Sequence, residues 1–275
     1  MNESSNGYLE TNDGKLYYET AGTGVPIVML HAGFLDRRMF DAQWAILAQN
    51  YRPIRYDMLG FGKSGAATRP VCRRENLLLL LDHCGVEAAH IVACSMGGTV
   101  ALDFALEHSS RVRSLTLVDA TPSGFEMQGA PPSLMMEMFG ALQQGDVDAA
   151  SELQIRIWLD TPTREPADID SELRRRALGM NRIAVERQTA LVADAQPVCP
   201  LEPAAVSRLS EVTCPALIVT GVLDHAEVQR AATMMAETMP GAHHVTIEAA
   251  GHVPSFERPD VFNVQLTKFL SALAG

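Results

Sequence analysis

Short runs of apolar residues recur along the chain, and most are followed by a stretch in which apolar residues return at helical spacing. The clearest runs cover residues 27–30, 91–94, 115–118 and 215–221. A run without polar interruptions is typical of a strand that is buried on both faces of a sheet. Two weaker strands at 8–10 and 16–21, joined by Asn12-Asp13-Gly14, predict a hairpin before them. The alternation of strands and helices predicts an α/β fold with a mostly parallel central sheet flanked by helices.

This alternation is interrupted in the second half of the chain, where no convincing strand occurs. Helical patterns cover residues 134–143, 147–159 and 171–193. We therefore predict a helical cap, residues 122–208, inserted between a first part of the α/β core at 1–121 and a second part at 209–275. Several methionines of the cap either line a pocket or, as we prefer, pack the cap onto the core, because Met adapts to irregular spaces. They are Met127, Met135, Met136 and Met138.

The composition of the chain limits the kinds of molecule that the protein is expected to bind. It has 275 residues, 47% of them hydrophobic, which is enough for a large core, and a net charge of −11. This acidic balance argues against nucleic acid or an anionic membrane surface as the partner. The apolar run at 77–81 is too short to span a bilayer, and residues 1–15 do not have the pattern of a secretory signal. We expect a cytoplasmic protein with a small-molecule partner, and homo-oligomer formation is left open.

The cysteines and histidines do not have the spacing of a metal site. Five cysteines, an odd number, are scattered along the chain: Cys72, Cys84, Cys94, Cys199 and Cys214. An unpaired set of this kind indicates reduced thiols. His31, His243 and His244 do not have ligand spacing either. Neither a metal ion nor an organic cofactor is therefore expected.

The strand at residues 90–94 runs directly into a tight turn and a helix, with Ser95 at the tip of the turn. A serine among small residues at such a strand–turn–helix corner is typical of the nucleophile elbow of hydrolases. Small neighbours are needed because the strained backbone at the serine requires close approach of strand and helix. Ala93, Gly97 and Gly98 supply them here. The helix N-terminus directs free N–H groups toward negative charge that develops at the serine.

Three other interpretations of these segments are weaker. Ser95 could serve only as the N-cap of the helix, a position that Ser often occupies. Cys94 could be the nucleophile, but strand alternation points its side chain away from the site. The glycine-rich segment 57–65 could bind a phosphate, but its spacing differs from Gly-x-x-x-x-Gly-Lys-Ser and no suitable helix follows it directly.

Further candidate residues lie in loops that follow predicted strands. Gly33, Asp224 and His252 each come directly after one of them. In a parallel sheet, ligands and catalytic groups collect in the loops beyond the carboxyl ends of the strands. A histidine there can activate a serine, and a carboxylate can orient the imidazole. Asp119, also at a strand end, is the rival for the acidic role, and Asp224 could instead cap the helix near residue 226.

Taken in order, these motifs make the chain similar to the α/β-hydrolase family over nearly its whole length. The similarity rests on His31-Ala32-Gly33, Asp57-x-x-Gly60-x-Gly62-x-Ser64, Ala93-Cys94-Ser95-Met96-Gly97-Gly98, Gly221-x-x-Asp224 and Gly251-His252. The resemblance implies that Ser95 is the nucleophile, His252 the general base and Asp224 the acid that orients the imidazole. It also implies an oxyanion hole formed by the backbone N–H groups of Gly33 and Met96.

Three residues depart from the usual pattern of that family. Ala93 stands in place of the first Gly of Gly-x-Ser-x-Gly, Ala32 stands where Gly is usual, and Cys94 stands where His is frequent. None of these changes removes a catalytic group, but Ala32 and Cys94 could reshape the wall of the pocket. His31 is expected to hold its loop by hydrogen bonds rather than to take part in chemistry.

The resulting hypothesis is a serine hydrolase that cleaves a small carboxylic ester through an acyl-enzyme. A serine nucleophile argues against the haloalkane dehalogenase and epoxide hydrolase branches of the fold, whose chemistry needs an alkyl-enzyme ester. The same residues could instead hydrolyse a carbon–carbon bond or a lactone, or carry out cofactor-free perhydrolysis, because the fold does not choose among these reactions. A small-ligand receptor is the alternative outside enzymes, and the presence of Ser95, Asp224 and His252 together argues against it.

Overall fold

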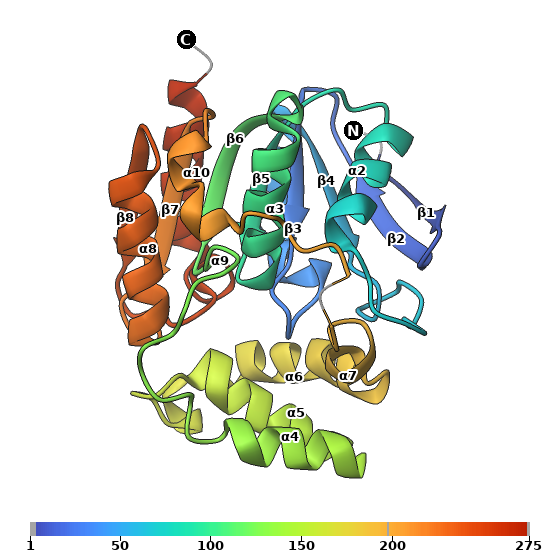
Figure 1. Cartoon of the computed structure of the whole chain (residues 1–275), viewed down its shortest axis with the longest axis vertical. Helices are drawn as coiled ribbons and strands as arrows, with labels where there is room; N and C mark the ends of the chain where they lie inside the picture. Colours follow the sequence, from blue (N-terminus) through green and yellow to red (C-terminus); the bar gives the residue numbers. More distant parts are fainter. Residues whose placement is uncertain (1–3, 197, 274–275) are drawn as a thin grey trace.

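An eight-stranded sheet forms the centre of the molecule, with the strand order β1-β2-β4-β3-β5-β6-β7-β8 (Figure 1). The structure is a computed structural model of the chain and describes residues 4–196 and 198–273. The strands are β1 (Ser5–Thr11), β2 (Gly14–Thr20), β3 (Val25–Leu30), β4 (Tyr51–Asp57), β5 (Ala89–Cys94), β6 (Val112–Val118), β7 (Ala216–Gly221) and β8 (Ala242–Ile247). β2 pairs antiparallel with β1 and with β4, and the other five pairs are parallel. The predicted mostly parallel sheet is confirmed.

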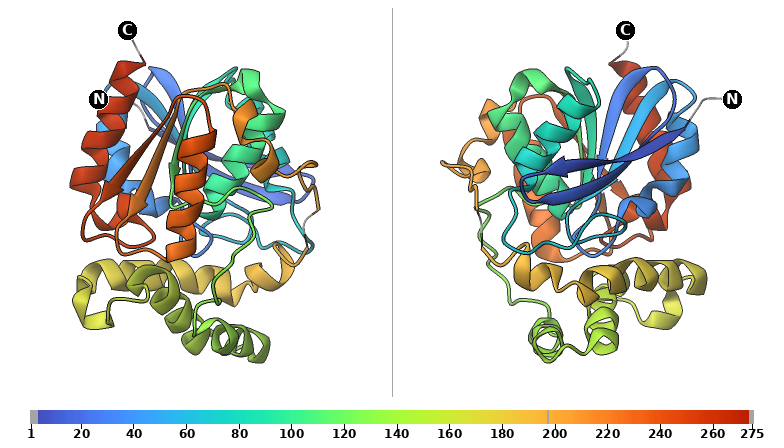
Figure 2. Two further views of the ribbon diagram at one scale, coloured as in Figure 1. Left: turned by 60° about the vertical axis from the view of Figure 1, so that its left-hand side comes forward. Right: turned by 90° about the vertical axis from the view of Figure 1, so that its right-hand side faces the viewer.

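Helices cover both faces of this sheet (Figure 2). They are α1 (Asp41–Leu47), α2 (Arg73–His83), α3 (Met96–Glu107), α8 (Ala226–Thr238), α9 (Pro254–Glu257) and α10 (Pro259–Ala272). α2, α3 and α8 pack on one face, and α1 and α10 pack on the other. Neighbouring residues of one strand join opposite clusters: Val28 and Ile91 lie under α2 and α3, whereas Ile27 and Val92 lie under α1 and α10. Burial on both faces explains the unbroken apolar runs of the strands.

A helical insertion separates β6 from β7 and lies across one end of the sheet (Figure 1). It consists of α4 (Met135–Gln144), α5 (Val147–Ile155), a π-helical segment (Arg156–Asp160), α6 (Ser171–Glu186) and α7 (Thr189–Val192). Asn181 donates a hydrogen bond to the Phe34 carbonyl after β3, and Thr189 donates one to the Gly60 carbonyl after β4. The insertion therefore covers the loops at the carboxyl ends of the parallel strands.

Two helices of the insertion differ from the sequence prediction. The pattern over 171–193 predicts one helix, but the chain breaks between α6 and α7, where Gln188 has a left-handed backbone with φ of 53°. The pattern over 147–159 changes from α-helix to π-helix after Ile155. Both patterns continue across the irregularity because apolar residues on either side still face the same cluster. Hydrophobic spacing alone does not record such a break.

The methionines of the insertion do not pack it onto the core as expected. Met138 is buried in a cluster formed by α4, α5, α6 and the π-helical segment, and Met135 packs against the same cluster. Met136 is 76% exposed, and Met127 is also exposed. Met135 and Met138 therefore hold the helices of the insertion to one another and Met136 faces solvent, whereas Met127 lines a small hollow, as the alternative interpretation expects.

Cys72 and Cys199 form a disulfide, which contradicts the expectation of five reduced thiols. Cys72 directly precedes α2, Cys199 lies between α7 and β7, and their Cα atoms are 5.7 Å apart. The sequence separation of 127 conceals the pairing, because no spacing rule relates two cysteines that only the tertiary fold brings together. Disulfides are rare in cytosolic proteins, so this pair weakens the expectation of a cytoplasmic location.

Replacing both Cys72 and Cys199 by serine should lower the free energy of unfolding by about 2–4 kcal/mol, because the crosslink restricts the unfolded chain. Urea unfolding of the variant and of wild type, each with and without reductant, measures this difference. Reductant should remove the difference by destabilising only the wild type.

The structure has three free cysteines, Cys84, Cys94 and Cys214, so thiol titration of the denatured, unreduced wild type should give three thiols. Five thiols would contradict the pairing.

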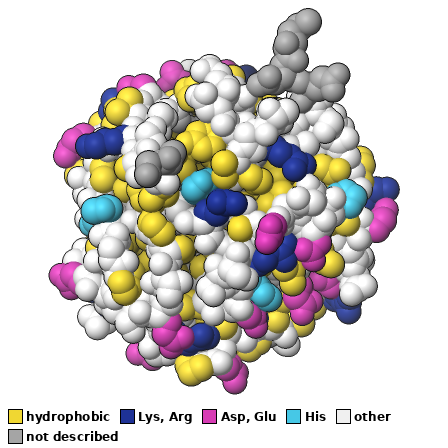
Figure 3. Space-filling view, turned by 90° about the horizontal axis from the view of Figure 1, so that it is seen from above, with side chains coloured by type: hydrophobic (Ala, Val, Ile, Leu, Met, Phe, Trp, Pro, Cys, Tyr) yellow, Lys and Arg dark blue, Asp and Glu magenta, His cyan; other side chains and the backbone are white. Residues whose placement is uncertain are grey.

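The surface offers two further observations. No helix among the described residues is both long and apolar enough to cross a membrane. At the end of the sheet opposite the insertion, acidic, basic and apolar side chains are interspersed (Figure 3). The chemistry-bearing residues of the sequence motifs lie at the other end, under the insertion.

Candidate active site

Ser95 occupies a sharp turn between β5 and α3. Its φ of 53° and ψ of −120° are values that L-residues rarely adopt, so the surrounding structure must hold the turn in place. Gly97 allows α3 to approach the loop after β3: a Cβ there would lie 2.7 Å from the carbonyl oxygens of Leu30 and His31. Gly98 is similarly tight against the loop after β6. These small residues make the predicted elbow sterically possible.

The structure brings the predicted residues Ser95, His252 and Asp224 together. His252 Nε2 lies 2.8 Å from Ser95 Oγ, and His252 Nδ1 lies 2.8 Å from Asp224 Oδ2. Asp224 belongs to the loop after β7, His252 belongs to the loop after β8, and both side chains are buried. The second carboxylate oxygen, Asp224 Oδ1, accepts a hydrogen bond from the His225 N–H at 2.7 Å. The carboxylate is therefore fixed from two sides, and it orients the imidazole toward the serine.

Asp119, the rival for the acidic role, is hydrogen-bonded to Asp224 and not to His252. Its carboxyl is fully buried and accepts the Gly221 N–H at 3.2 and 3.3 Å. Burial, followed by the negative charge of Asp224, raises the pKa of Asp119 well above its ordinary value. Burial opposes ionisation of Asp224 as well, but the adjacent His252 holds the pKa of Asp224 below its ordinary value. The two environments therefore favour a protonated Asp119 beside an ionised Asp224.

Gly33 and Met96, the residues predicted to form the oxyanion hole, are neighbours at this elbow. Met96 is the first residue of α3, so its N–H has no acceptor within the helix. A Cβ on Gly33 would lie 3.3 Å from Cβ and Sδ of Met96, which shows that the two residues are neighbours. Within the described part of the chain, neither N–H donates to a protein acceptor. Two free donors on neighbouring residues, one of which directly follows the serine, could together bind a developing oxyanion.

Two aromatic side chains flank the imidazole of His252. The Phe34 ring, next to Gly33 in the loop after β3, lies 6.4 Å away between ring centroids, and the Trp158 ring lies 4.9 Å away. Trp158 belongs to the π-helical segment of the insertion, and such segments are frequent at functional sites. The position of Phe34 after the His31-Ala32-Gly33 motif could have indicated its role. No sequence signal marks Trp158.

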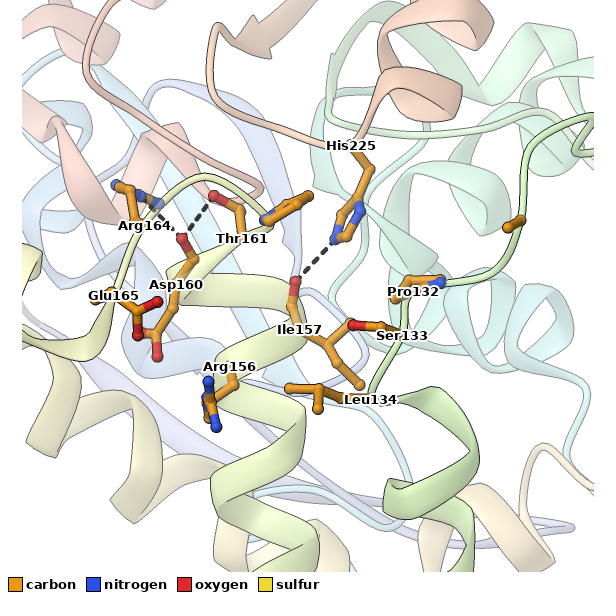
Figure 4. Close-up of a pocket in the computed structure, with 12 residues that line it drawn as sticks. Pro132, Ser133, Leu134, Arg156, Ile157, Asp160, Thr161, Arg164, Glu165 and His225 are labelled. Atoms are coloured by element: carbon orange, nitrogen blue, oxygen red, sulfur yellow. Dashed lines mark hydrogen bonds between the residues drawn. The ribbon is translucent and has the colours of Figure 1, made fainter.

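A hollow of about 320 Å³ lies between segments of the insertion and His225, the residue before α8 (Figure 4), and neither Ser95 nor His252 lines it. Its walls include Arg156, Ile157 and Asp160 of the π-helical segment, as well as His225, whose Nε2–H donates to the Ile157 carbonyl at 2.8 Å. A smaller hollow of about 160 Å³ shares His225 and is also lined by Trp158 and Met127. Trp158 thus lies between that smaller hollow and the catalytic candidate His252.

His31 and Cys94 take no part in the chemistry suggested for the site. His31 Nδ1–H donates to the Ala32 carbonyl, and its Nε2 accepts the Met58 N–H, each at 2.9 Å. Burial lowers the pKa of His31 to about 4, so the ring is neutral and pins its loop as predicted. Cys94 is fully buried, and its thiol donates to the His252 carbonyl. Burial raises the pKa of Cys94 well above its ordinary value, which keeps the thiol un-ionised and a poor nucleophile.

The glycine-rich loop at 57–65 wraps around a carboxylate of its own. Asp57 accepts hydrogen bonds from the backbone N–H groups of Arg37 and Lys63, at 3.0 and 2.7 Å, and from the Arg37 guanidinium at 2.8 Å. Backbone N–H groups that already bind a buried carboxylate are not free to cradle a phosphate. Among the described residues, no group of three or more His, Cys, Asp or Glu side chains is arranged to hold a metal ion.

The fold and this arrangement of residues are those of a hydrolase, and the chain belongs to the alpha/beta hydrolase family, whose model matches residues 27–265. It is 28% identical over 273 residues to 2-hydroxy-6-oxononadienedioate/2-hydroxy-6-oxononatrienedioate hydrolase 1 of Dechloromonas aromatica, covering 94% of this chain and 91% of that protein. It is 27% identical over 262 residues to pimeloyl-(acyl-carrier protein) methyl ester esterase of Pectobacterium atrosepticum, covering 94% and 99%. A thermophilic esterase from Thermogutta terrifontis shares the fold, with a TM-score of 0.80, 24% identity and coverage of 98% and 99%.

Proposed function

We propose that this hydrolase cleaves a small carboxylic ester through an acyl-enzyme on Ser95. The observation that carries the proposal is the chain of two 2.8 Å hydrogen bonds from Ser95 through His252 to Asp224, at a strained turn beside free N–H groups. A serine hydroxyl is a weak nucleophile unless a base accepts its proton. His252 is placed to be that base, and Asp224 is placed to stabilise the imidazolium that results.

In the first half of the proposed reaction, Ser95 Oγ attacks the carbonyl carbon of the ester while its proton passes to His252 Nε2. The carbonyl oxygen becomes an oxyanion, which accepts hydrogen bonds from the N–H groups of Gly33 and Met96. The tetrahedral intermediate then collapses, the bond from carbon to the alcohol oxygen breaks, and His252 returns the proton to the departing alcohol. Ser95 is left as an ester of the acid.

In the second half, water replaces the alcohol. His252 Nε2 accepts a proton from the water as its oxygen attacks the acyl carbon, and the same N–H groups stabilise the second oxyanion. The bond from the acyl carbon to Ser95 Oγ breaks, and the serine recovers the proton from His252. Asp224 stays ionised throughout, and Phe34 and Trp158 limit access of bulk water to the imidazole.

The test is acid-quenched hydrolysis of nitrophenyl esters of increasing acyl length. A stoichiometric burst of nitrophenol should precede steady turnover, because acylation releases the alcohol before the acyl-enzyme is hydrolysed. Mass spectrometry of the quenched protein should find the acyl group on the peptide that contains Ser95. The acyl length with the highest rate then measures the space that the enzyme offers to the acyl chain bound at Ser95. Nitrophenol release with the adduct on another peptide would contradict the proposal.

Carbon–carbon bond hydrolysis is the second candidate, and the similarity to the Dechloromonas aromatica hydrolase favours it. Turnover of a 2-hydroxy-6-oxodienoate far above that of every ester would replace the ester proposal with this one. Preference for lactones, or for peroxide as the acyl acceptor, would similarly reassign the reaction of the same residues. Thermal stabilisation by these compounds without any turnover would favour the receptor alternative.

A further inference from the structure

The carboxylate of Glu257 holds the backbone on both sides of His252. Glu257 is the last residue of α9, and its Oε1 accepts the N–H of Gly251 at 3.0 Å and the N–H of Val253 at 3.3 Å. Its side chain is only 3% exposed. A single oxygen therefore fixes the loop immediately before and immediately after the imidazole.

The helical insertion supplies the cation that balances this carboxylate. Arg164 Nη1 donates to Glu257 Oε2 at 2.7 Å, and the Arg164 side chain is 10% exposed. The same guanidinium donates to the carbonyls of Asp160 and Leu159, at 3.0 and 2.5 Å, and Figure 4 shows it reaching back to Asp160. Arg164 thus connects the end of the π-helical segment to the His252 loop.

Two features make this connection specific to the loop. Gly251 lies so close to Arg164 that a Cβ at this position would collide with the guanidinium and with Thr161. The π-helical segment that Arg164 holds also carries Trp158, whose ring lies 4.9 Å from the His252 ring. The insertion is therefore connected to His252 in two ways. Trp158 contacts the imidazole ring directly, and Arg164 acts through Glu257, which binds the backbone on both sides of His252.

We propose that Glu257 and Arg164 are positioning residues, through which the insertion sets the orientation of His252 toward Ser95. The inference rests on the proposed function, because it assigns these residues to the base of that reaction. Neither side chain lies against Ser95 in the structure, so their loss should reduce kcat and the reactivity of Ser95 while KM changes little. A buried ion pair is strongly disturbed when one partner is removed, since a charge is left buried without compensation.

The experiment is a double-mutant cycle with Glu257→Gln, Arg164→Met and the two combined, read out by the rate at which a fluorophosphonate labels Ser95. Each single variant should label about 10- to 100-fold more slowly, because a small displacement of a general base is costly. In the double variant, the Gln carbonyl oxygen can still accept the N–H groups of Gly251 and Val253, and no charge is left unpaired. Its loss should therefore be smaller than the larger of the two single losses.

Arg73→Met is the matched control. Arg73 is 6% exposed and pairs with Asp194 of the insertion through two 2.9 Å hydrogen bonds, and it also donates to the Leu59 carbonyl. It therefore joins insertion and core as Arg164 does, but away from the His252 loop. This variant should lose stability while its folded form labels at the wild-type rate. Labelling of the Glu257 and Arg164 variants at the wild-type rate, or losses no larger than that of Arg73→Met, would overturn the inference.

Two further measurements distinguish a loss of positioning from a loss of folding or of the proposed function. If a single variant does not fold, Arg164→Lys retains the charge beside Glu257 but not the contacts to both carbonyls, and it should fold and label slowly. Hydrogen exchange at the Gly251 and Val253 amides does not depend on catalysis, and it should be faster in Arg164→Met than in wild type. If wild-type Ser95 does not label at all, the proposed function fails. Unchanged exchange at these amides would then count separately against the positioning role.

Discussion

Replacing His252 by alanine should lower kcat for the preferred ester by about 10⁶-fold, with the fold retained. The imidazole is the only side chain within hydrogen-bond distance of Ser95 Oγ among the described residues, at 2.8 Å. Without it, no group accepts the proton of the serine or returns one to the departing alcohol. The N–H groups of Gly33 and Met96 remain, and they should preserve a rate about 10³–10⁴-fold above that in water. Steady-state and single-turnover hydrolysis measure both levels.

His90→Ala is the control for this prediction. His90 lies on β5 five residues before Ser95, and its ring bonds Ser114 rather than the serine. His90 is half-buried, and its removal also takes an imidazole and a hydrogen bond from the sheet, so this variant controls for the loss of a histidine that does not contact the serine. Circular dichroism should show both folded. An activity of His252→Ala within a few-fold of that of His90→Ala would mean that another group is the base.

The fold was largely predictable because its strands are buried on both faces. Such strands leave unbroken apolar runs, and alternation with helices then restricts the topology to a parallel sheet with right-handed crossovers. The site was predictable for a related reason. Strand ends in a parallel sheet converge, so Ser95, Asp224 and His252 could be placed near one another from their positions after β5, β7 and β8.

What could not be predicted depends on contacts between distant segments. Trp158 reaches His252 only because the chain adopts a π-helical turn at Arg156–Asp160, which hydrophobic spacing does not encode. Arg164 looks like an ordinary surface charge in the sequence until the insertion folds over α9 and places it against Glu257. The disulfide similarly joins segments 127 residues apart. Each of these contacts involves the insertion, and the sequence of its short helices does not indicate which distant residues they contact.

The proposal assigns the acidic role to Asp224 rather than Asp119 because Asp224 contacts His252, and this assignment makes a second prediction with a large effect. Asp224→Asn should lower kcat by about 10⁴-fold, because an amide at the position of Oδ2 can stabilise the wrong tautomer of His252. Asp119→Asn should cost about tenfold at most, because an amide can still donate to Asp224 as the protonated carboxyl does. Hydrolysis of the preferred ester by the two variants provides the comparison. The reverse ranking would show that Asp119 is the acid.

The same pair predicts opposite dependences of stability on pH, which separates the two carboxyls without any substrate. The pKa of Asp119 is raised in the folded protein, so its contribution to stability is complete below the ordinary Asp pKa and is lost as the pH rises above it. The pKa of Asp224 is lowered, so its contribution to stability is present above the ordinary Asp pKa and is lost as the pH falls.

Asp119→Asn removes the titration of Asp119. The variant should therefore gain stability relative to wild type as the pH rises from about 4 toward neutrality. Urea unfolding across that range measures the difference. If the stability difference between variant and wild type stayed constant with pH, Asp119 would ionise normally in the folded state. Two adjacent buried carboxylates would then need a cation to balance them. The carboxyl of Asp119 contacts Asp224 and the Gly221 N–H in the structure, and neither is a cation.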